Sequence, residues 1–426
     1  MNNKKNNNMS RREFVKASAA MGAAAIFSGK ERLFAAGSDK LRVGLIGCGG
    51  RGTGAAMDCV RSSPNVEIVA LGDVFKDRLA HSLTQLSENL DDKVSVTRDT
   101  SFTGFDAYEK VLACDIDMVI LACPPHFRPR HLKAAVEAGK HVFMEKPVAV
   151  DPVGFHSVIA SSDIAQEKGL AIVAGTQRRH QNHYRETMKR IHNGDIGEPI
   201  SGQCYFNVGG WDGPNGKPEN MSDMEYQIRY WFHFTWLSGD EIVEQHVHNI
   251  DVINWAMGSH PTKTLGIGGR QVRSGDGNIY DHFTVEFEYP NGARVMSMCR
   301  HMEGCANNVC ERVMGTNGIA YTDDAVGLIE GPNAYKHSGQ AHNPYVTEHA
   351  DLIESIRSNQ PVNEGRQVAE STLTAIMGRM SAYTGRAISW DWIVNASKLD
   401  LSPPAYNFDI NLPVRPIPIP GKTKLI

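Results

Sequence analysis

The stretch LRVGLIGCGGRGTG, residues 41–54, decides the fold of this chain. Its first half is mostly apolar, and its second half is rich in glycine. A short apolar run that ends in turn residues is typical of a buried strand in a parallel sheet. Gly47, Gly49 and Gly52 fit the spacing G-x-G-x-x-G, and a helix-like run, AAMDCVRS, follows them. We therefore predict a strand, a tight glycine turn and a helix, in that order.

The glycine turn is suited to binding a dinucleotide. In such turns one glycine makes the tight bend, one lets the backbone approach the pyrophosphate, and one lets the helix pack closely on the strand. The N-terminus of the helix then offers free N–H groups to the phosphates. The spacing alone is weak evidence in a chain with 40 glycines, because glycine turns also occur in α/β units that bind no dinucleotide.

An acidic residue at the end of the next strand favours the dinucleotide interpretation. The run VEIVALGD ends at Asp73, where a carboxylate binds the ribose hydroxyls of the cofactor. A carboxylate also repels a 2′-phosphate, so we expect NAD in preference to NADP, although Lys76 and Arg78 lie nearby. The predicted cofactor residues of this region are Gly47, Gly49, Gly50, Arg51, Gly52 and Asp73.

Length and composition are those of an ordinary globular protein with two or three domains. The chain has 426 residues, of which 41% are hydrophobic and 22% charged. A net charge of −4 leaves no basic footprint for nucleic acid or an anionic membrane. After residue 40 no apolar run reaches the about 18 residues that a membrane span needs. We expect neither a nucleic-acid partner nor an internal transmembrane helix.

The N-terminus has the pattern of an export signal. Residues 10–16, SRREFVK, precede the small-residue stretch ASAAMGAAAIFSG. A charged region, an apolar region and small residues in this order describe a secretory signal. The S-R-R-x-F-x-K form looks like a twin-arginine signal, which exports folded proteins. We expect residues 1–37 to be this signal and the mature protein to be periplasmic, without a membrane anchor; the alternative is an amphipathic helix on a cytoplasmic enzyme.

The eight cysteines show no metal-binding or disulfide pattern. Cys48, Cys114 and Cys123 lie in or beside predicted strands, where cysteine behaves as a small hydrophobic residue. Cys305 and Cys310 form a C-x4-C pair, but no second pair with metal-ligand spacing accompanies it. We predict no metal site and no obligatory disulfide framework.

Strand and helix patterns alternate from Asp39 to about Pro152, which predicts a parallel sheet with crossover helices. The strand DMVILAC ends at Pro124-Pro125-His126. Because loops at the carboxyl ends of such strands line the ligand crevice, we place Pro124 and His126 in the cofactor site. A further strand, KHVFM, runs directly into Glu145-Lys146-Pro147.

The glycine turn, the P-P-H loop and the E-K-P sequence, in this order, resemble the Gfo/Idh/MocA oxidoreductase family, which includes glucose–fructose oxidoreductase and inositol dehydrogenase. The resemblance covers nearly all of residues 40–390. It implies a Rossmann NAD-binding domain, here over residues 38–160, and a C-terminal α/β domain with a large, open, mostly antiparallel sheet, here over residues 161–395. It also implies that Lys146 reaches the substrate hydroxyl beside the nicotinamide, with Glu145 and Lys146 bordering the cofactor.

Two further segments are candidates for the cleft. In the family, an Asn, Gln or Tyr followed by an Arg faces the active site at the position of Thr176-Gln177-Arg178-Arg179-His180. The resemblance therefore implies that Gln177 contacts the cofactor and Arg179 the substrate, unless this is a solvated loop. The loop 207–227 is long enough to be functional or mobile, and Trp211 in it is a candidate sugar platform. A plain surface excursion is an equal alternative.

The densest chemistry lies in WFHFTWLSGDEIVEQHVHNID, residues 231–251. From Asp240 onward the apolar spacing is helical, so Glu244, His248 and Asp251 would share one face. The family's H-x-I-D context matches through His248 and Asp251, whereas Glu244 replaces the usual aspartate. The resemblance implies that His248 is the general base, with Glu244 and Asp251 orienting it or binding neighbouring hydroxyls. The alternative is a helix with several solvated polar residues.

After residue 260 the pattern turns to consecutive antiparallel strands, with a hairpin signal at Asn291-Gly292. Arg300, at the end of one strand, and Trp231 are candidate substrate contacts. We expect helices over residues 347–358 and 367–384. The proline-rich tail, residues 396–426, is expected to lie extended over the surface or a partner subunit.

We interpret the chain as a periplasmic NAD(P)-dependent oxidoreductase that moves a hydride between a nicotinamide and a hydroxyl or keto carbon of a sugar or glycoside. Histidine has an ordinary pKa near neutrality, which suits a general base, so we predict this role for His248, and Lys146 would bind the same oxygen. The alternatives are an NAD-dependent glycosidase that oxidises its sugar transiently, and a non-catalytic cofactor- or sugar-binding protein. We expect a homo-oligomer, a dimer or tetramer, formed through the C-terminal sheet.

Overall fold

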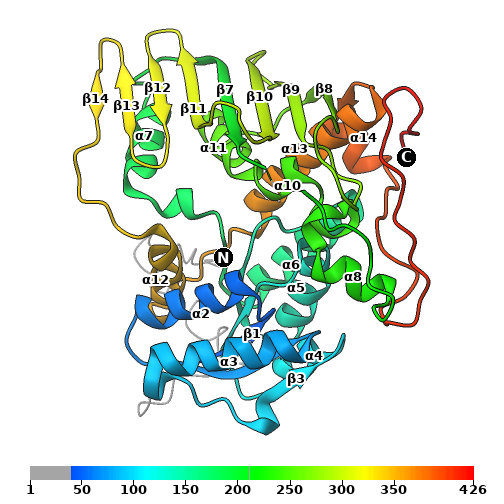
Figure 1. The fold of residues 1–426 in the computed structure, drawn as a ribbon. Coiled ribbons are helices and arrows are strands. Elements are labelled where there is room, and N and C mark those ends of the chain that lie inside the picture. The colour runs from blue at the N-terminus through cyan, green and yellow to red at the C-terminus, as the bar shows by residue number, and fades with distance from the viewer. Residues whose placement is uncertain (1–39, 211) are drawn as a thin grey trace, which may run out of the picture. The chain divides into compact units, whose positions relative to one another are not determined.

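The computed structural model describes residues 40–210 and 212–426. The predicted signal, residues 1–37, and the candidate platform Trp211 lie outside the described residues. Residues Leu41–Ile426 form one compact unit, which contains two sheets (Figure 1).

The first sheet is parallel and six-stranded, with the order β3-β2-β1-β4-β5-β6. Its central β1 is buried on both faces because helices cover both sides, as its apolar run predicts. The strand order reverses between β1 and β4, where such sheets bind ligands. The strands are β1 (Leu41–Ile46), β2 (Val66–Asp73), β3 (Ser101–Thr103), β4 (Met118–Leu121), β5 (His141–Met144) and β6 (Ile172–Ala174). The helices between them are α2 (Gly50–Ser62), α3 (Lys76–Leu90), α4 (Ala107–Ala113), α5 (Arg128–Glu137) and α6 (Pro152–Glu167).

The first domain extends beyond the predicted boundary at residue 160. That boundary falls inside α6, and β6 then adds to the parallel sheet by pairing with β5. A later helix, α12 (Pro344–Arg357), also packs on α2 and contributes Leu352 and Ile353 to the core around β1. The first domain is therefore assembled from two separate parts of the chain, which a single boundary cannot describe.

The second sheet has nine strands in the order β14-β13-β12-β11-β7-β10-β9-β8-β15. Only β7 and β10 pair in parallel, so the predicted large, mostly antiparallel sheet is confirmed. The sequence patterns miss the central β7, whose buried positions include the small residues Gly202 and Cys204. The strands are β7 (Pro199–Val208), β8 (Lys263–Gly269), β9 (His282–Glu288), β10 (Arg294–His301), β11 (Asn308–Gly315), β12 (Ile319–Thr322), β13 (Gly327–Glu330), β14 (Tyr335–Lys336) and β15 (Ile388–Ser389).

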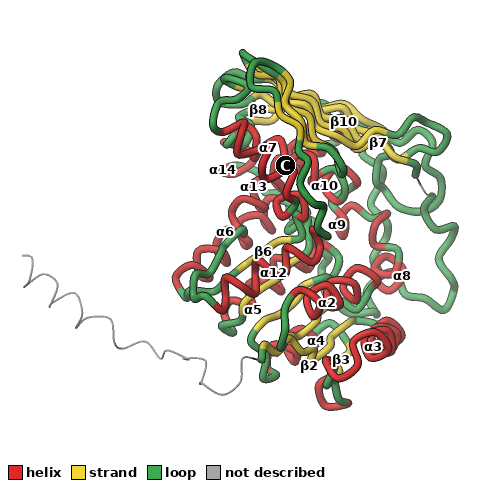
Figure 2. Tube along the Cα trace, turned by 90° about the vertical axis from the view of Figure 1, so that its left-hand side faces the viewer, coloured by secondary structure: helices red, strands yellow, loops and turns green. Residues whose placement is uncertain are grey.

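Helices cover one face of the nine-stranded sheet, as Figure 2 shows. The most buried of them, α13 (Gly365–Thr384), packs on β8 and β9. The opposite face carries exposed apolar side chains at Ile200, Leu265, Ile267 and Ile319. The other helices of this part are α7 (Asn182–His192), α8 (Asp223–Arg229), α9 (Thr235–Ser238), α10 (Glu241–Glu244), α11 (Val247–Met257) and α14 (Trp390–Asn395). Within the described ranges, no helix is long and apolar enough to cross a bilayer.

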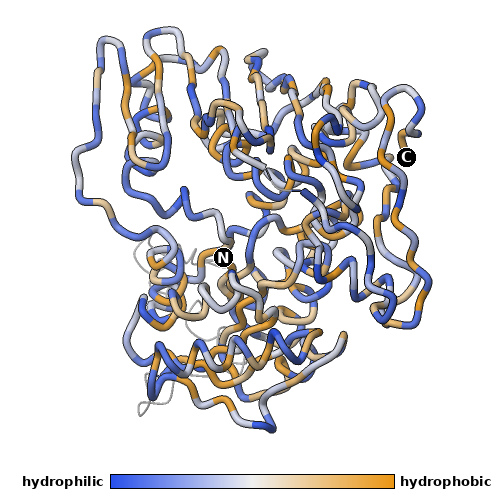
Figure 3. Tube along the Cα trace, viewed as in Figure 1, coloured by the Kyte–Doolittle hydropathy of each residue, from blue (hydrophilic) through white to orange (hydrophobic). Residues whose placement is uncertain are grey.

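The tail after α14 runs without helix or strand along α8 to the first domain, in red in Figure 1. Hydrophobic and hydrophilic residues alternate along it (Figure 3). Leu401 is buried in a cluster that includes Phe75, Phe127 and Trp236. The extended tail therefore lies on this chain itself, over residues of the first domain.

Candidate active site

A first cavity opens at the carboxyl ends of β1, β2 and β4, and the glycine turn forms one wall of it. Gly47 has a φ of +100°, and a Cβ added to it would lie 2.5 Å from the backbone of Ala122 and Cys123. A Cβ on Gly52 would lie 1.9 Å from the Gly47 carbonyl oxygen. By contrast, no atom lies within 4 Å of a Cβ added to Gly49. Two glycines therefore allow close packing, while the third leaves open space for a ligand.

The polar groups of this cavity fit a dinucleotide. Helix α2 begins at Gly50 with no acidic residue in its first turn, so its first amides can bind a phosphate. Asp73 ends β2, and its carboxylate accepts hydrogen bonds from the amides of Cys48 at 2.7 Å and Phe75 at 2.8 Å. These bonds fix the carboxylate in the cavity wall, where ribose hydroxyls would meet it. Burial raises the pKa of Asp73 above its ordinary value.

Of the two residues predicted from the P-P-H loop, Pro124 lines the first cavity and His126 does not. The His126 ring packs edge-on against Trp236, and its Nε2 lies 2.8 Å from the Tyr406 hydroxyl of the tail. Burial lowers the pKa of His126 to about 4, so the ring is neutral near pH 7. The structure thus places His126 behind the cavity wall, because its side chain follows the short helix at Pro125–Phe127 toward the tail.

A second cavity adjoins the first, and both are lined by Arg51, Ala122, Cys123 and Trp231. The predicted residues that also line it are Glu145, Lys146, Gln177, Glu244 and His248. Trp231 was predicted as a substrate contact, and it lies where the two cavities meet. Residues that are far apart in the sequence thus line the second cavity, which lies next to the first.

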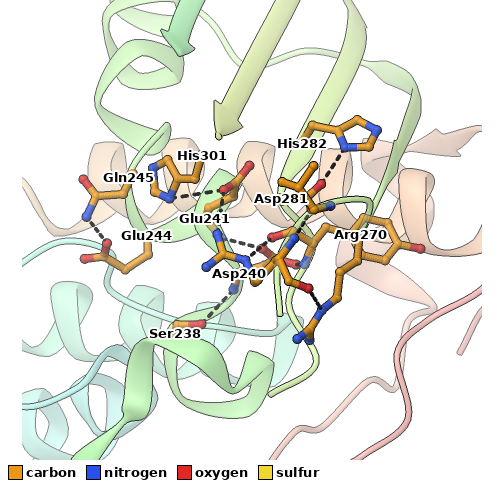
Figure 4. Close-up of polar contacts among 12 residues, drawn as sticks. Ser238, Asp240, Glu241, Glu244, Gln245, Arg270, Asp281, His282 and His301 are labelled. Carbon is orange, nitrogen blue, oxygen red and sulfur yellow. Dashed lines mark hydrogen bonds and ion pairs between the residues drawn. The ribbon is translucent and has the colours of Figure 1, made fainter. Parts of the chain in front are cut away.

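Lys146 and Glu244 form a buried ion pair in this second cavity. Lys146 lies two residues after the end of β5, and a cis peptide bond joins it to Pro147. Its Nζ lies 2.8 Å from Glu244 Oε1. The same Nζ donates to the Glu244 carbonyl oxygen, and Gln245 donates to the other carboxylate oxygen (Figure 4). Burial raises the pKa of Glu244, and the charge of Lys146 opposes that rise. An ammonium has three N–H donors, so one remains for a substrate oxygen.

The predicted continuous helix from Asp240 is broken after Glu244. In a continuous helix the Glu244 carbonyl would accept a hydrogen bond from the amide of His248. Here Lys146 takes that carbonyl, and the His248 amide instead donates to Gln245 at 3.3 Å. Helix α10 therefore ends at Glu244, and α11 starts again at Val247.

His248 is half-buried and lines the second cavity. Burial, reinforced by the charge of Lys146, lowers the pKa of His248 well below 6.5. Its ring is therefore neutral at physiological pH and able to accept a proton. Its Nδ1 is buried and has no hydrogen-bond partner among the described residues.

Asp251 and Arg179 do not line the second cavity, because they bind each other. Arg179 donates from Nε and Nη2 to the two Asp251 carboxylate oxygens, at 2.7 and 2.9 Å. Ser371 of α13 also donates to Asp251 at 2.7 Å. The expectation that Asp251 shares a working face with Glu244 is therefore wrong, since the break after Glu244 separates the two helices. Arg300 also lies outside the cavity, and its guanidinium donates to the Ala306 carbonyl.

A buried polar cluster holds the start of α10 in place (Figure 4). Asp240 has a φ of +74°, a conformation that non-glycine residues rarely adopt. Its carboxylate accepts from the amides of Glu241 at 2.6 Å and Tyr280 at 2.9 Å, and from the Tyr383 hydroxyl. Burial raises the pKa of Asp240 to about 6. These bonds support the short helix that ends at Glu244.

Several residues that line the second cavity were not predicted from the sequence, and among them Gln245 and Tyr345 contact predicted site residues. Tyr345 begins α12, its ring lies 5.0 Å from the Arg51 guanidinium, and its hydroxyl lies 3.4 Å from Gln177 Nε2. No local signal marks Tyr345, because only tertiary packing brings α12 to this place. Gln245 directly follows Glu244 in the sequence, so its place in the site could have been predicted from that position.

Arg51 links the glycine turn to the second cavity. Its Nε lies 2.5 Å from Glu145 Oε1 and its Nη2 lies 3.4 Å from Glu348 Oε1, on α12. The predicted cofactor residues Arg51 and Glu145 thus form one ion pair at the junction of the two cavities.

Comparison with known families identifies the class of protein. The model described as the oxidoreductase family's NAD-binding Rossmann fold matches residues 41–176, and the GFO/IDH/MocA C-terminal domain matches residues 184–321. The chain belongs to the Gfo/Idh/MocA family of oxidoreductases, which confirms the resemblance seen in its motifs.

Individual relatives agree with this assignment. An inositol 2-dehydrogenase from Burkholderia lata is 26% identical over 294 residues, which cover 68% of this chain and 77% of the relative. The fold matches levoglucosan dehydrogenase in complex with NADH and levoglucosan, with a TM-score of 0.65, 16% identity, and coverage of 82% of this chain and 99% of the other. It also matches a 3-ketoreductase from Actinomadura kijaniata in complex with NADP and TDP-benzene, with a TM-score of 0.62, 18% identity, and coverage of 80% and 98%.

Proposed function

We propose that this protein is an NAD-dependent oxidoreductase of a hydroxyl carbon in a sugar, glycoside or related cyclic polyol. The observation that carries the proposal is the second cavity, where Lys146, Glu244 and His248 meet beside the cavity of the glycine turn. Inositol and levoglucosan, named in its relatives, are ring compounds with several hydroxyl groups, which supports this substrate class.

The residues of the second cavity fit proton handling at one substrate oxygen. A bound nicotinamide supplies the hydride chemistry. In the oxidation direction His248, neutral because of its lowered pKa, accepts the hydroxyl proton. The remaining N–H of Lys146 donates to the same oxygen and stabilises the negative charge that develops on it. Glu244 holds the ammonium of Lys146 in place through its carboxylate and its carbonyl.

The test is turnover on a substrate panel with NAD supplied. Purified protein is incubated with cyclic polyols, sugars and aryl glycosides, and both NADH and released aglycone are measured. We expect NADH to form in proportion to an oxidised product. Release of aglycone at constant NAD would identify the glycosidase alternative, and dinucleotide binding without turnover of any panel member would favour a binding protein.

We also propose that NAD is preferred to NADP. Asp73 supports this preference, because its fixed carboxylate would accept ribose hydroxyls and repel a 2′-phosphate. Arg78, in the same cavity wall, opposes it. Calorimetry with both dinucleotides decides the matter, and equal or tighter binding of NADP would contradict the proposal.

Export and assembly complete the proposal. Arg11 and Arg12 lie in a full twin-arginine pattern, so we propose a periplasmic enzyme loaded with its cofactor before export. Replacing both arginines by lysine should leave the protein in the cytoplasm, whereas an unchanged periplasmic yield would contradict this.

We further propose a homo-oligomer through the sheet face that exposes Ile200 and Ile267, to be checked by light scattering on Ile267→Lys.

A further inference from the structure

The C-terminal tail is hydrogen-bonded to two separate elements, the N-terminus of α6 and helix α8. The amide of Leu401 donates to Asp151, the N-cap of α6, at 2.8 Å. The amide of Leu412 donates to Asp223 of α8 at 2.9 Å, and Gln227 of α8 donates to the Leu412 carbonyl at 2.6 Å. The segment between these anchors, residues 401–412, is therefore held against the protein at both ends.

Two aromatic residues of this segment pack on the first domain. The Tyr406 ring lies 5.8 Å from the ring of Phe127 and 6.4 Å from that of Phe105, and its hydroxyl meets His126. The Phe408 ring lies 5.1 Å from Phe105 and stacks on another ring of the first domain, that of Phe75, at 6.0 Å. In this way the tail contacts the loops that follow β2, β3 and β4 at once.

Two of the residues that the tail contacts form part of the wall of the first cavity. Phe105 and Phe127 line the cavity on one side and pack on the tail on the other. Phe75 does not line the cavity, but its amide donates a hydrogen bond of 2.8 Å to the carboxylate of Asp73, which does line it. Ile228 within α8, the helix to which the tail is hydrogen-bonded, and Trp231 just after it also line the cavity.

We propose that the tail, through Tyr406 and Phe408, is a positioning element that retains the dinucleotide in its cavity. This inference rests on the proposed function, since it requires a bound dinucleotide. The tail joins the loops of that wall to α8, so it restrains movement of the wall around a bound ligand. Loosening the tail should therefore speed release of the cofactor without changing the chemistry at Lys146 and His248, which lie in the other cavity.

Release kinetics test the proposal directly. NADH is bound to the purified protein, excess NAD is added, and the loss of NADH fluorescence gives the release rate. We expect Tyr406→Ala and Phe408→Ala each to release NADH about tenfold faster than wild type, because the first removes the ring contacts to Phe105 and Phe127 and the second those to Phe105 and Phe75. Tyr406→Phe removes only the hydroxyl and should have a smaller effect. Ile417→Ala, at an exposed position further along the same tail, is the matched control and should release NADH at the wild-type rate.

A second measurement separates cofactor retention from a merely structural role. If the tail favours the bound state, the bound cofactor must favour the closed tail to the same extent. Hydrogen exchange at the amides of Leu401 and Leu412 should therefore slow when NAD is added, whereas the single-turnover rate of NADH formation at saturating NAD stays at the wild-type value in both alanine variants, because that rate does not include cofactor release. Wild-type release rates in both variants, or exchange that NAD leaves unchanged, would overturn the role of the tail alone. A wild-type protein that binds no dinucleotide would overturn the proposed function and this inference with it.

Discussion

The two cavities of this protein are built in different ways. Apart from Ile228 and Trp231, the first cavity is lined by residues between Ile46 and His131, which follow one another through β1, β2, β3 and β4. The second takes its lining from segments as far apart as Arg51 and Tyr345. A ligand site made from neighbouring loops of one sheet leaves a legible pattern in the sequence, whereas a site assembled across domains leaves isolated polar residues.

The difference has a physical basis. The first cavity depends on steric exclusion, since only glycine fits where an added Cβ would lie 1.9 Å from a backbone oxygen, as at Gly52. The second depends on polar groups that satisfy one another over long sequence distances, as when Lys146 takes the carbonyl of Glu244. We therefore expect substitutions in the first cavity to change folding and cofactor binding, and substitutions in the second cavity to change the rate of the chemical step.

The largest effect is expected from the proton-handling pair. Lys146→Ala and His248→Ala should each lower kcat by about 10²–10⁴-fold, because each removes a group that acts on the reacting oxygen. Both variants should still bind NAD, and the double variant should be little worse than the poorer single one. Lys133→Ala and His342→Ala, at exposed positions, are the controls. Near-normal turnover by His248→Ala would show that another residue is the base.

Asp251→Asn tests whether the H-N-I-D sequence is divided between chemistry and folding. Breaking a buried ion pair by removing one partner costs about 3–5 kcal/mol, so this variant should lose that much free energy of unfolding in urea. Its kcat should stay near the wild-type value, because Asp251 binds Arg179 rather than His248. Asp163→Asn breaks the exposed pair with Arg366 and should change stability by about 1 kcal/mol at most. A large loss of kcat in folded Asp251→Asn would show that Asp251 does take part in catalysis.

Two alanine substitutions in the glycine turn should affect different properties, stability at Gly52 and NAD binding at Gly49. Gly52→Ala forces a backbone shift and should lower the free energy of unfolding by about 1–3 kcal/mol. Gly49→Ala meets no protein atom, so it should change stability by only about 0.5 kcal/mol while weakening NAD binding. Thermal unfolding and calorimetry measure the two effects. Equal destabilisation by both variants would contradict the steric distinction.

The smallest effect concerns pH. The pKa of His248 lies well below 6.5, so kcat/KM should hold as pH falls through 6.5 and drop only at lower pH, where His248 gains a proton. Part of this lowering comes from the charge of Lys146, so the acid limb should move upward in Lys146→Met, measured on its residual activity. An acid limb at or above pH 6.5 in the wild type would contradict the assignment of the base.

Much of the fold could be predicted from local patterns, and the exceptions are informative. The parallel sheet, the hairpin at Asn291-Gly292 and the helix α13 follow from periodicity and turn residues. The strand β7 escapes notice because glycine and cysteine occupy positions where a sheet usually shows large apolar residues. The first domain's boundary escapes because β6 is short and α12 returns from far along the chain.

For the active site, the sequence by itself determined the glycine turn, the acid at Asp73 and the presence of Lys146, Glu244 and His248. It could do so because each depends on residue type and near neighbours. Tertiary packing alone makes Asp251 bind Arg179, turns His126 to Tyr406, and places Tyr406 of the tail on Phe105 and Phe127. These are choices of partner among groups distant in sequence, and packing selects the partner because a buried charge or polar group must find one.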